Sequence, residues 1–147
     1  MKNEFFKDVP GFEGKYQVSN LGNVRSLDRE VYRSFSDGRE AHIAKLRGKM
    51  MKKSTDALGY QHVRLFVQGG KAELWKVHQL VALTFLGHDR KVGGREVIVH
   101  HKNGIKNDNR LENLEVVERA SHILIHKLSY AAIKEIKPRK YTKRQGA

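Results

Sequence analysis

The chain has 147 residues, a formal net charge of +13 and no cysteine. This length suits one compact domain, or two small modules that share a core. The lack of cysteine excludes disulfides and thiolate zinc sites, and no apolar run is long enough to cross a bilayer. Because there is no secretory signal pattern either, we expect a cytoplasmic protein without a membrane partner.

Residues 5–27 predict a compact antiparallel β unit. Turn signals such as Pro10-Gly11 separate two short alternating strands, at 16–18 and 24–27, which should pair as a hairpin. The polar segment 28–42 is expected to form a loop or a long hairpin arm.

The middle of the chain changes from a strand pattern to a helix pattern. Residues 59–67 alternate strongly between apolar and polar side chains, and residues 72–75 should pair back onto them across a Gly-Gly turn. After that the apolar residues follow helical spacing, and Gly87 should end the helix. The residues at this spacing are Val77, Leu80, Val81, Thr84 and Phe85, and all but Thr84 are apolar.

The last patterned segment predicts a β-β-α unit. Residues 96–101 form an apolar strand, and residues 114–117 form a second, shorter one. A loop of amides and charges joins them. Ser121 or a residue next to it should cap a helix that runs to about Ile136.

Four histidines lie in this unit. His100 and His101 close the first strand, where neighbouring residues point to opposite sides, so one can face the helix and the other a substrate. His122 and His126 are one helical turn apart and share a face. His100, His122 and His126 could therefore supply three imidazoles to one divalent ion that acts as a Lewis acid.

The net positive charge of the chain lies before and after the histidine-containing stretch and not within it. Residues 100–126 have a net charge of zero. The stretches 31–60, 61–99 and 127–147 carry +4, +3 and +6. A polyanion held by the flanks and cut in the middle needs this layout, so the histidines indicate metal-assisted cleavage of a phosphodiester. The plain alternative is a solvated basic surface with a disordered tail.

His101 is predicted to be the general base, since the pKa of an imidazole suits proton transfer from an attacking water near neutrality. Asn109 and Asn113 are expected to tie down the backbone that carries it. The helix start near Ser121 would place a positive dipole close to the scissile phosphate. His78, on the apolar helix, is expected to be a packing histidine with satisfied hydrogen bonds.

The order of these motifs resembles the HNH, or His-Me finger, endonucleases, especially the homing type of phages and introns. Their typical run is Asn-His-x-Asp-Gly, then Asn-Asn-Arg-x-Glu-Asn-Leu, then a helix with Asn or His. This chain has His100-His101-Lys102-Asn103-Gly104, then Asp-Asn-Arg-Leu-Glu-Asn-Leu at 108–114, then His122. Residues 77–85 look like the helix that precedes the motif in that family.

Residues 9–26 resemble the nuclease-associated modular DNA-binding motif that accompanies such enzymes. The two resemblances imply an α+β fold in which an N-terminal antiparallel β module precedes a ββα-metal finger. The expected domains are a DNA-binding module at 1–55, a nuclease domain at 56–136 with the ββα motif at 96–136, and a basic tail at 137–147.

The resemblance implies that His101 is the general base, that Asn113 is a structural amide, and that His100 and His122 are metal ligands. His100 stands where Asn or Asp is usual and His122 where Asn is usual, while His126 is additional. These changes move toward the His-His and His-x-x-x-His arrangement of the nuclease colicins. We expect Mg²⁺ or Mn²⁺, with Zn²⁺, Ni²⁺ or Co²⁺ as alternatives because imidazoles favour transition ions.

We therefore expect a metal-dependent endonuclease that nicks or cuts double-stranded DNA, encoded by a phage or mobile element and acting in the host cytoplasm. No obligate protein partner is evident. Little chain follows the motif helix, so a further helix-turn-helix module has no room and sequence specificity should be relaxed.

Arginines of the N-terminal arm can read guanine edges, and basic residues near the C-terminus can bind phosphates. The expected DNA contacts are Arg25, Arg29, Arg33, Arg39, Arg110, Lys134, Lys137, Arg139 and Lys140. The main alternative is a DNA-binding module or repressor with a structural metal site, which would not need His101. An RNA-binding basic protein is the third interpretation, although the sequence lacks a recognisable aromatic stacking platform.

Overall fold

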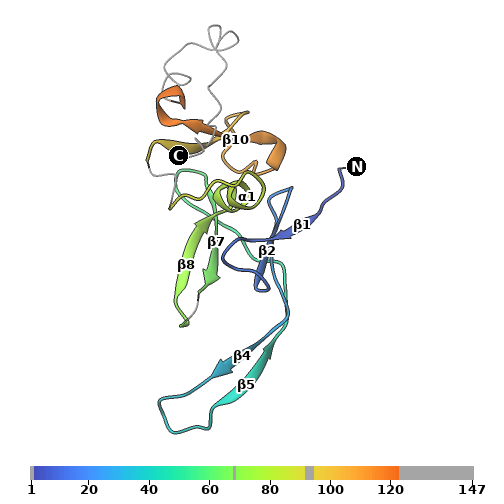
Figure 1. Cartoon of the computed structure of the whole chain (residues 1–147), viewed down its shortest axis with the longest axis vertical. Helices are drawn as coiled ribbons and strands as arrows, with labels where there is room; N and C mark the ends of the chain where they lie inside the picture. Colours follow the sequence, from blue (N-terminus) through green and yellow to red (C-terminus); the bar gives the residue numbers. More distant parts are fainter. Residues whose placement is uncertain (1, 68, 92–94, 123–147) are drawn as a thin grey trace, which may run out of the picture.

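The computed structural model describes residues 2–67, 69–91 and 95–122. They form short antiparallel sheets around the helix α1 (Val77–Phe85), and one end of the molecule is drawn out into a long hairpin (Figure 1). The strands in chain order are β1 (Phe6–Asp8), β2 (Tyr16–Ser19), β3 (Val24–Ser26), β4 (Arg29–Arg33), β5 (His42–Leu46), β6 (Ser54–Thr55), β7 (Gln61–Phe66), β8 (Ala72–Lys76), β9 (Val97–His101) and β10 (Leu114–Glu118).

The N-terminal sheet has the strand order β1-β2-β3. Val18 pairs with Val24 across the β2–β3 hairpin, and both side chains are fully buried. Gly22 in the connecting turn has a φ of +82°, which only glycine adopts at little cost. The predicted hairpin is therefore confirmed.

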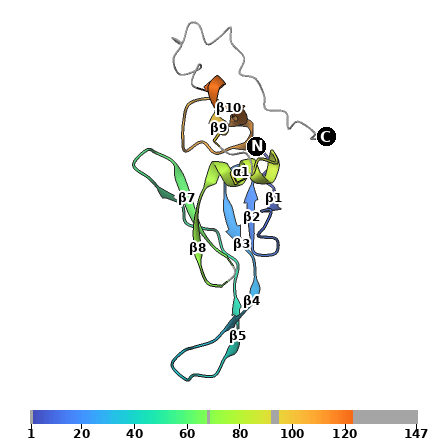
Figure 2. The same cartoon turned by 60° about the vertical axis from the view of Figure 1, so that its left-hand side comes forward.

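β4 and β5 form a two-stranded arm in which Val31 lies opposite Ala44. The arm projects away from the rest of the molecule in both views (Figure 1, Figure 2). Its apolar side chains Tyr32 and Ile43 are 73 % and 65 % exposed, so the arm has no apolar core of its own. Of the two structures expected for residues 28–42, the hairpin arm is the one that forms.

A second sheet, in the order β6-β7-β8, leads directly into α1. The residues at helical spacing cover one face of the helix, and Leu80 and Val81 are fully buried. The helix ends where Gly87 takes a φ of +66° and the His88 N–H donates to the Ala82 carbonyl at 3.1 Å. The predicted helix and its glycine stop are confirmed.

One apolar core joins the N-terminal sheet to the elements that follow it. Tyr16 of β2 lies in the same cluster as Leu65 of β7, Leu80 of α1 and Leu114 of β10. The Tyr16 hydroxyl also accepts a hydrogen bond from the Phe66 N–H at 3.1 Å. Burying each large apolar side chain contributes about 1.5–3 kcal/mol to folding, so these elements stabilise one another.

β9 and β10 pair antiparallel beside α1, with Val99 opposite Val116 (Figure 2). The loop between them closes through a 3₁₀ turn at Leu111–Asn113. The chain is helical again at residues 119–122, so the predicted β-β-α order is present.

The start of this last helix differs from the sequence prediction. The helix begins at Arg119, so Ser121 lies inside its first turn and does not cap it. The Arg119 N–H donates to the Glu96 carbonyl at 2.7 Å. This backbone bond satisfies one of the N–H groups at the start of the helix that have no partner within the helix.

Several predictions fall outside the described residues. They concern His126, the tail at 137–147, and Lys134, Lys137, Arg139 and Lys140. The expected domain boundaries also stay predictions. Within residues 2–67, 69–91 and 95–122, no helix is both long and apolar enough to cross a membrane.

Candidate active site at the end of β9

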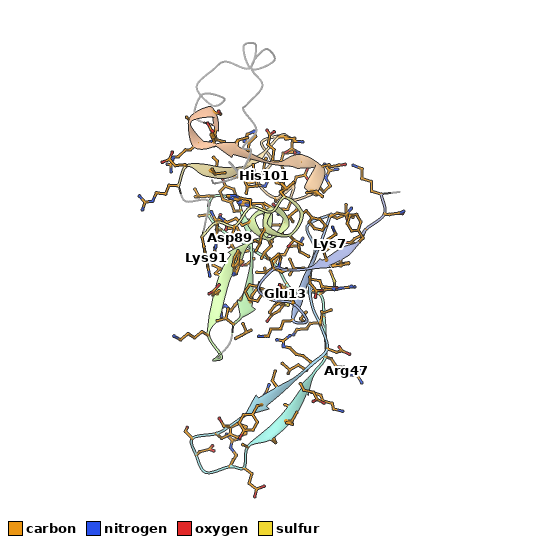
Figure 3. The ribbon with its side chains drawn as sticks, viewed as in Figure 1. Lys7, Glu13, Arg47, Asp89, Lys91 and His101 are labelled. Carbon is orange, nitrogen blue, oxygen red and sulfur yellow. The ribbon has the colours of Figure 1, made fainter. Side chains whose placement is uncertain are left out.

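His101 is the last residue of β9 and is 6 % exposed. Its ring packs toward α1, with its centroid 5.0 Å from that of His78, and Figure 3 shows it between the β9–β10 pair and the body of the molecule. Its Nε2 lies 3.1 Å from Oδ1 of Asn109. Burial lowers the pKa of His101, which favours the neutral ring that can accept a proton.

His100 precedes it on the same strand and points to the opposite side. Its ring faces that of His122, with the centroids 5.1 Å apart and the planes at 74°. The structure thus brings His100 and His122 together, as strand alternation predicted. Within the part of the chain that the structure describes, no group of three His, Cys, Asp or Glu side chains is placed to hold a metal. The third expected ligand, His126, lies outside that part.

The loop that follows β9 folds around the Asn113 side chain, which is 6 % exposed. Its Oδ1 accepts from the Asn103 N–H at 3.0 Å, and its Nδ2 donates to the Asp108 carbonyl at 2.8 Å. The Asn113 carbonyl accepts from the Lys102 N–H at 2.8 Å. These bonds hold the backbone directly after His101, so Asn113 is placed to act as a positioning residue.

Asn109 is the amide that contacts the His101 ring, and it is 3 % exposed. Its Nδ2 donates to Oε1 of Gln61 at 3.0 Å. Gln61 begins β7, far from the histidine motif in the sequence. Gln61 could not be recognised from the sequence, because a glutamine in an alternating strand carries no signal that sets it apart from a surface residue.

His78 packs against two rings, with its centroid 5.3 Å from Tyr60 and 5.0 Å from His101. It is 6 % exposed, as expected of a packing histidine. The expectation that its hydrogen bonds are satisfied is wrong for one atom: Nδ1 has no partner among the residues described. The ring lies against aromatic faces, and an unsatisfied buried polar atom costs about 1–3 kcal/mol.

The burial of His78 predicts a pH-dependent stability. Burial lowers its pKa to about 3, the positive charges of His101, Lys76 and His62 act in the same direction, and Asp56 opposes them. The folded-state pKa therefore lies below the unfolded value of about 6.5. As the pH falls from about 6.5 toward 3, His78 is protonated in the unfolded chain before it is protonated in the folded chain. The free energy of unfolding should drop by about 2 kcal/mol between pH 7 and pH 5 from this residue alone.

The variant His78→Phe keeps an aromatic ring in place and removes the titrating group. Urea unfolding of both proteins at the two pH values measures the effect. We expect the stability loss between pH 7 and pH 5 to be smaller in the variant by about 2 kcal/mol. Equal losses in the two proteins would contradict the prediction.

Four of the five described arginines that are expected to bind DNA have partners inside the protein. Arg25 donates to Oε1 of Gln17 at 2.7 Å and stacks on Phe6, with its guanidinium 4.0 Å from the ring centroid. Arg110 donates to Asp108 at 2.7 Å, and this bond holds the pKa of the Asp108 carboxyl well below its usual range. Both guanidinium groups therefore also contribute to local structure.

The other three arginines of this set belong to the arm. Arg29 lies over the Tyr16 ring at its base, and Arg39 pairs with Asp37 at its turn. Arg33, at the end of β4, is exposed. Figure 3 shows that the arm lies at the opposite end of the molecule from His101, and that Arg47, which directly follows β5, lies where the arm joins the body. The arm and the histidines are thus separate regions.

Two family models match this chain. The NUMOD4 motif matches residues 4–66, and the HNH endonuclease model matches residues 76–124. The second range holds α1, β9, β10 and the three described histidines of the site. Residues 76–124 therefore resemble the HNH endonucleases, and residues 4–66 resemble the NUMOD4 motif. The family resemblance found in the sequence is therefore confirmed.

Two relatives show the same similarity. The chain is 33% identical over 119 residues to the DNA endonuclease I-HmuI of Bacillus phage SP01, which covers 80% of the chain and 55% of that protein. It is 37% identical over 124 residues to the uncharacterized HNH endonuclease L247 of Acanthamoeba polyphaga mimivirus, which covers 83% of the chain and 26% of that protein.

A solved structure, described as DNA binding and cleavage by the HNH homing endonuclease I-HmuI, matches the fold with a TM-score of 0.61. The identity is 29%, and the match covers 89% of the chain and 64% of that structure. The α+β fold class is confirmed. The chain spans less than two thirds of each of these three matches.

Proposed function

We propose that this chain is a metal-dependent endonuclease that hydrolyses phosphodiester bonds of double-stranded DNA, by nicking or by double-strand cleavage. The proposal depends on one observation: the two histidines at the end of β9 point to opposite sides of the strand and contact different groups. His101 packs on one side against Asn109, and His100 meets His122 on the other. Because His101 and His100 are neighbours on the strand, the base and the metal-binding pair His100 and His122 can act on one phosphate from two directions.

His101 would take a proton from the attacking water, whose oxygen forms the new bond to phosphorus. The bond from phosphorus to the leaving sugar oxygen breaks, and that oxygen takes a proton from solvent. General-base catalysis of this kind contributes about 10²–10⁴-fold to rate. Asn109 would orient the imidazole, and Asn113 would hold the backbone that carries it.

The metal would be held by His100 and His122, with His126 as the third expected ligand. The donor set fits, since imidazole nitrogens from a strand end and a helix bind divalent ions well. The bound ion would supply Lewis-acid stabilisation of charge on the phosphate. Mg²⁺ and Mn²⁺ are proposed as working ions, with Zn²⁺, Ni²⁺ and Co²⁺ as alternatives.

Most of the proposed DNA contacts lie outside the neutral stretch 100–126. Arg33 on the exposed arm is the described arginine best placed to reach DNA. A two-stranded β ribbon fits the width of a major groove, where guanidinium groups can read guanine edges. Further proposed contacts are Arg25, Arg29, Arg39, Arg110, Lys134, Lys137, Arg139 and Lys140.

A role of the arm in DNA binding predicts a change in salt dependence. Arg33→Gln and Arg47→Gln should each weaken DNA binding. The slope of log affinity against log salt should fall by about 0.9 for each phosphate that the variant no longer neutralises. Binding isotherms at several salt concentrations, on two unrelated duplexes, measure this slope and its sequence dependence.

The outcome separates two uses of the arm. A flatter slope on both duplexes means phosphate contacts, and a larger loss on one duplex means a base contact worth about 1–3 kcal/mol. An unchanged slope and unchanged affinity in both variants would exclude the arm from DNA binding.

The activity itself is tested by incubating the chain with supercoiled plasmid and a panel of divalent ions, with and without EDTA. We expect metal-dependent conversion to nicked or linear DNA. Binding without cleavage at any ion would favour the repressor alternative, and cleavage of a matched RNA alone would favour RNA as the substrate. A phage-encoded enzyme of this kind would act in the host cytoplasm.

A further inference from the structure

An asparagine amide can face an imidazole in two ways. Its oxygen accepts a hydrogen bond from a ring N–H, whereas its NH₂ group donates to a ring lone pair. The end that faces the ring therefore decides which ring nitrogen carries the hydrogen. In this structure Oδ1 of Asn109 faces Nε2 of His101 at 3.1 Å. Since this oxygen only accepts, Nε2 carries the hydrogen and Nδ1 has the lone pair.

Gln61 holds the Asn109 amide in this orientation. Its Oε1 accepts from Nδ2 of Asn109 at 3.0 Å. If the Asn109 amide turned over while Gln61 kept its orientation, two oxygens would face each other at this contact, and the Asn109 NH₂ would donate to Nε2 of His101. Asn109 is 3 % exposed, so water is poorly placed to relieve such a clash. The Gln61 oxygen thus favours one amide orientation and, through it, one form of the imidazole.

The backbone of Asn109 is fixed by a second part of the N-terminal region. A Cβ added at Gly22, in the β2–β3 turn, would lie 2.8 Å from Cβ of Asn109. Nearby in the same turn, the carbonyl of Asn20 accepts from the Leu111 N–H at 2.9 Å. The chain at Asn109 therefore packs tightly against this turn and cannot move closer to it.

We propose that Gln61 is a positioning residue for the reaction: it holds Oδ1 of Asn109 toward His101 and so leaves Nδ1 as the nitrogen that takes the proton. This inference rests on the proposed function. Gln61 and Gly22 both lie in residues 4–66, the range that matches the NUMOD4 motif. That range then helps to set the base, in addition to the DNA binding expected of it.

Two variants of the full chain separate the hydrogen bond from the shape of the side chain. Gln61→Met keeps the length and removes the strong acceptor, while Gln61→Glu keeps an acceptor at either carboxylate oxygen. We expect Gln61→Met to lower the single-turnover cleavage rate at saturating protein by about 10–100-fold, with the DNA dissociation constant unchanged. Gln61→Glu should restore a rate close to that of the wild type.

The imidazole itself gives a second readout. Nitrogen and carbon NMR of labelled histidine distinguishes the two neutral ring forms, and it is recorded at about pH 8, above the usual pKa of histidine. We expect His101 in the form with Nε2–H in the wild type and in Gln61→Glu. In Gln61→Met we expect the form with Nδ1–H to gain population.

Val63→Ala is the matched control, because Val63 is a buried residue of the same strand without a polar side chain. It should lower stability but leave the cleavage rate of the folded protein unchanged. The inference is overturned if Gln61→Met cleaves at the wild-type rate, if Gln61→Glu is as slow as Gln61→Met, or if Val63→Ala slows cleavage equally. If the wild-type chain cleaves no DNA with any divalent ion, the proposed function fails instead.

Discussion

Replacing His101 by alanine should abolish DNA cleavage while leaving DNA affinity nearly intact. The imidazole is neutral and buried at the end of β9, so its removal takes away a proton acceptor without changing the charge that DNA meets. Loss of a general base costs about 10²–10⁴-fold in rate. Single-turnover cleavage of supercoiled plasmid measures the rate, and a binding isotherm measures the affinity.

Since the His101 ring packs against His78, the alanine variant also leaves a cavity. His101→Gln is therefore a useful second variant, because it fills more of the space and still provides no comparable base. His88→Gln is the control: His88 is 9% exposed, follows α1 and has no role in the proposed chemistry. Near-wild-type turnover in His101→Ala, with a normal thermal melt, would contradict the assignment of the base.

The parts of the fold that follow from local pattern could be predicted from the sequence. Period-two alternation in the stretch around Val63 predicted β7, and apolar spacing around Leu80 predicted α1, because one face of each element has to be buried. Strand alternation also predicted that His100 and His101 separate onto opposite sides. Each of these inferences needs only neighbours in the sequence.

The parts that depend on distant contacts could not be predicted in this way. Gln61 meets Asn109 through the packing of β7 beside the loop after β9, and a single sequence without an alignment carries no trace of that pairing. The start of the last helix was misplaced for the same reason. Its first N–H is satisfied by the Glu96 carbonyl of the preceding segment, which no capping pattern reveals.

Arg25 and Arg110 illustrate the limit for surface charges. Their residue type suggested DNA contacts, but in the structure each guanidinium binds a partner within the protein. An arginine that supports the fold and one that meets a phosphate look alike in sequence. The burial and hydrogen bonds of the folded chain are needed to separate the two, and they favour Arg33 on the arm.

Removing a proposed metal ligand should strongly reduce both divalent-ion affinity and DNA cleavage. His100→Ala and His122→Ala should each weaken divalent-ion binding by at least about tenfold, with a matching loss of cleavage at low metal concentration. The reason is that the two rings face each other across the β9–helix junction, so either one alone is a poor site. Calorimetric titration with Ni²⁺, Co²⁺ and Mn²⁺ measures the affinity directly.

The double variant His100→Asp with His122→Asn tests which ion the site prefers. It replaces both imidazoles by the oxygen-bearing residues usual at these positions in the family that the chain resembles. Because carboxylate and amide oxygens suit Mg²⁺ and Mn²⁺ while imidazoles favour Ni²⁺, Co²⁺ and Zn²⁺, the ion that supports cleavage should shift toward the first group. His42→Ala, an exposed histidine on the arm, should change neither affinity nor preference. An unchanged affinity in His122→Ala would exclude the proposed metal site, and an unchanged ion preference in the double variant would show that these two side chains do not select the metal.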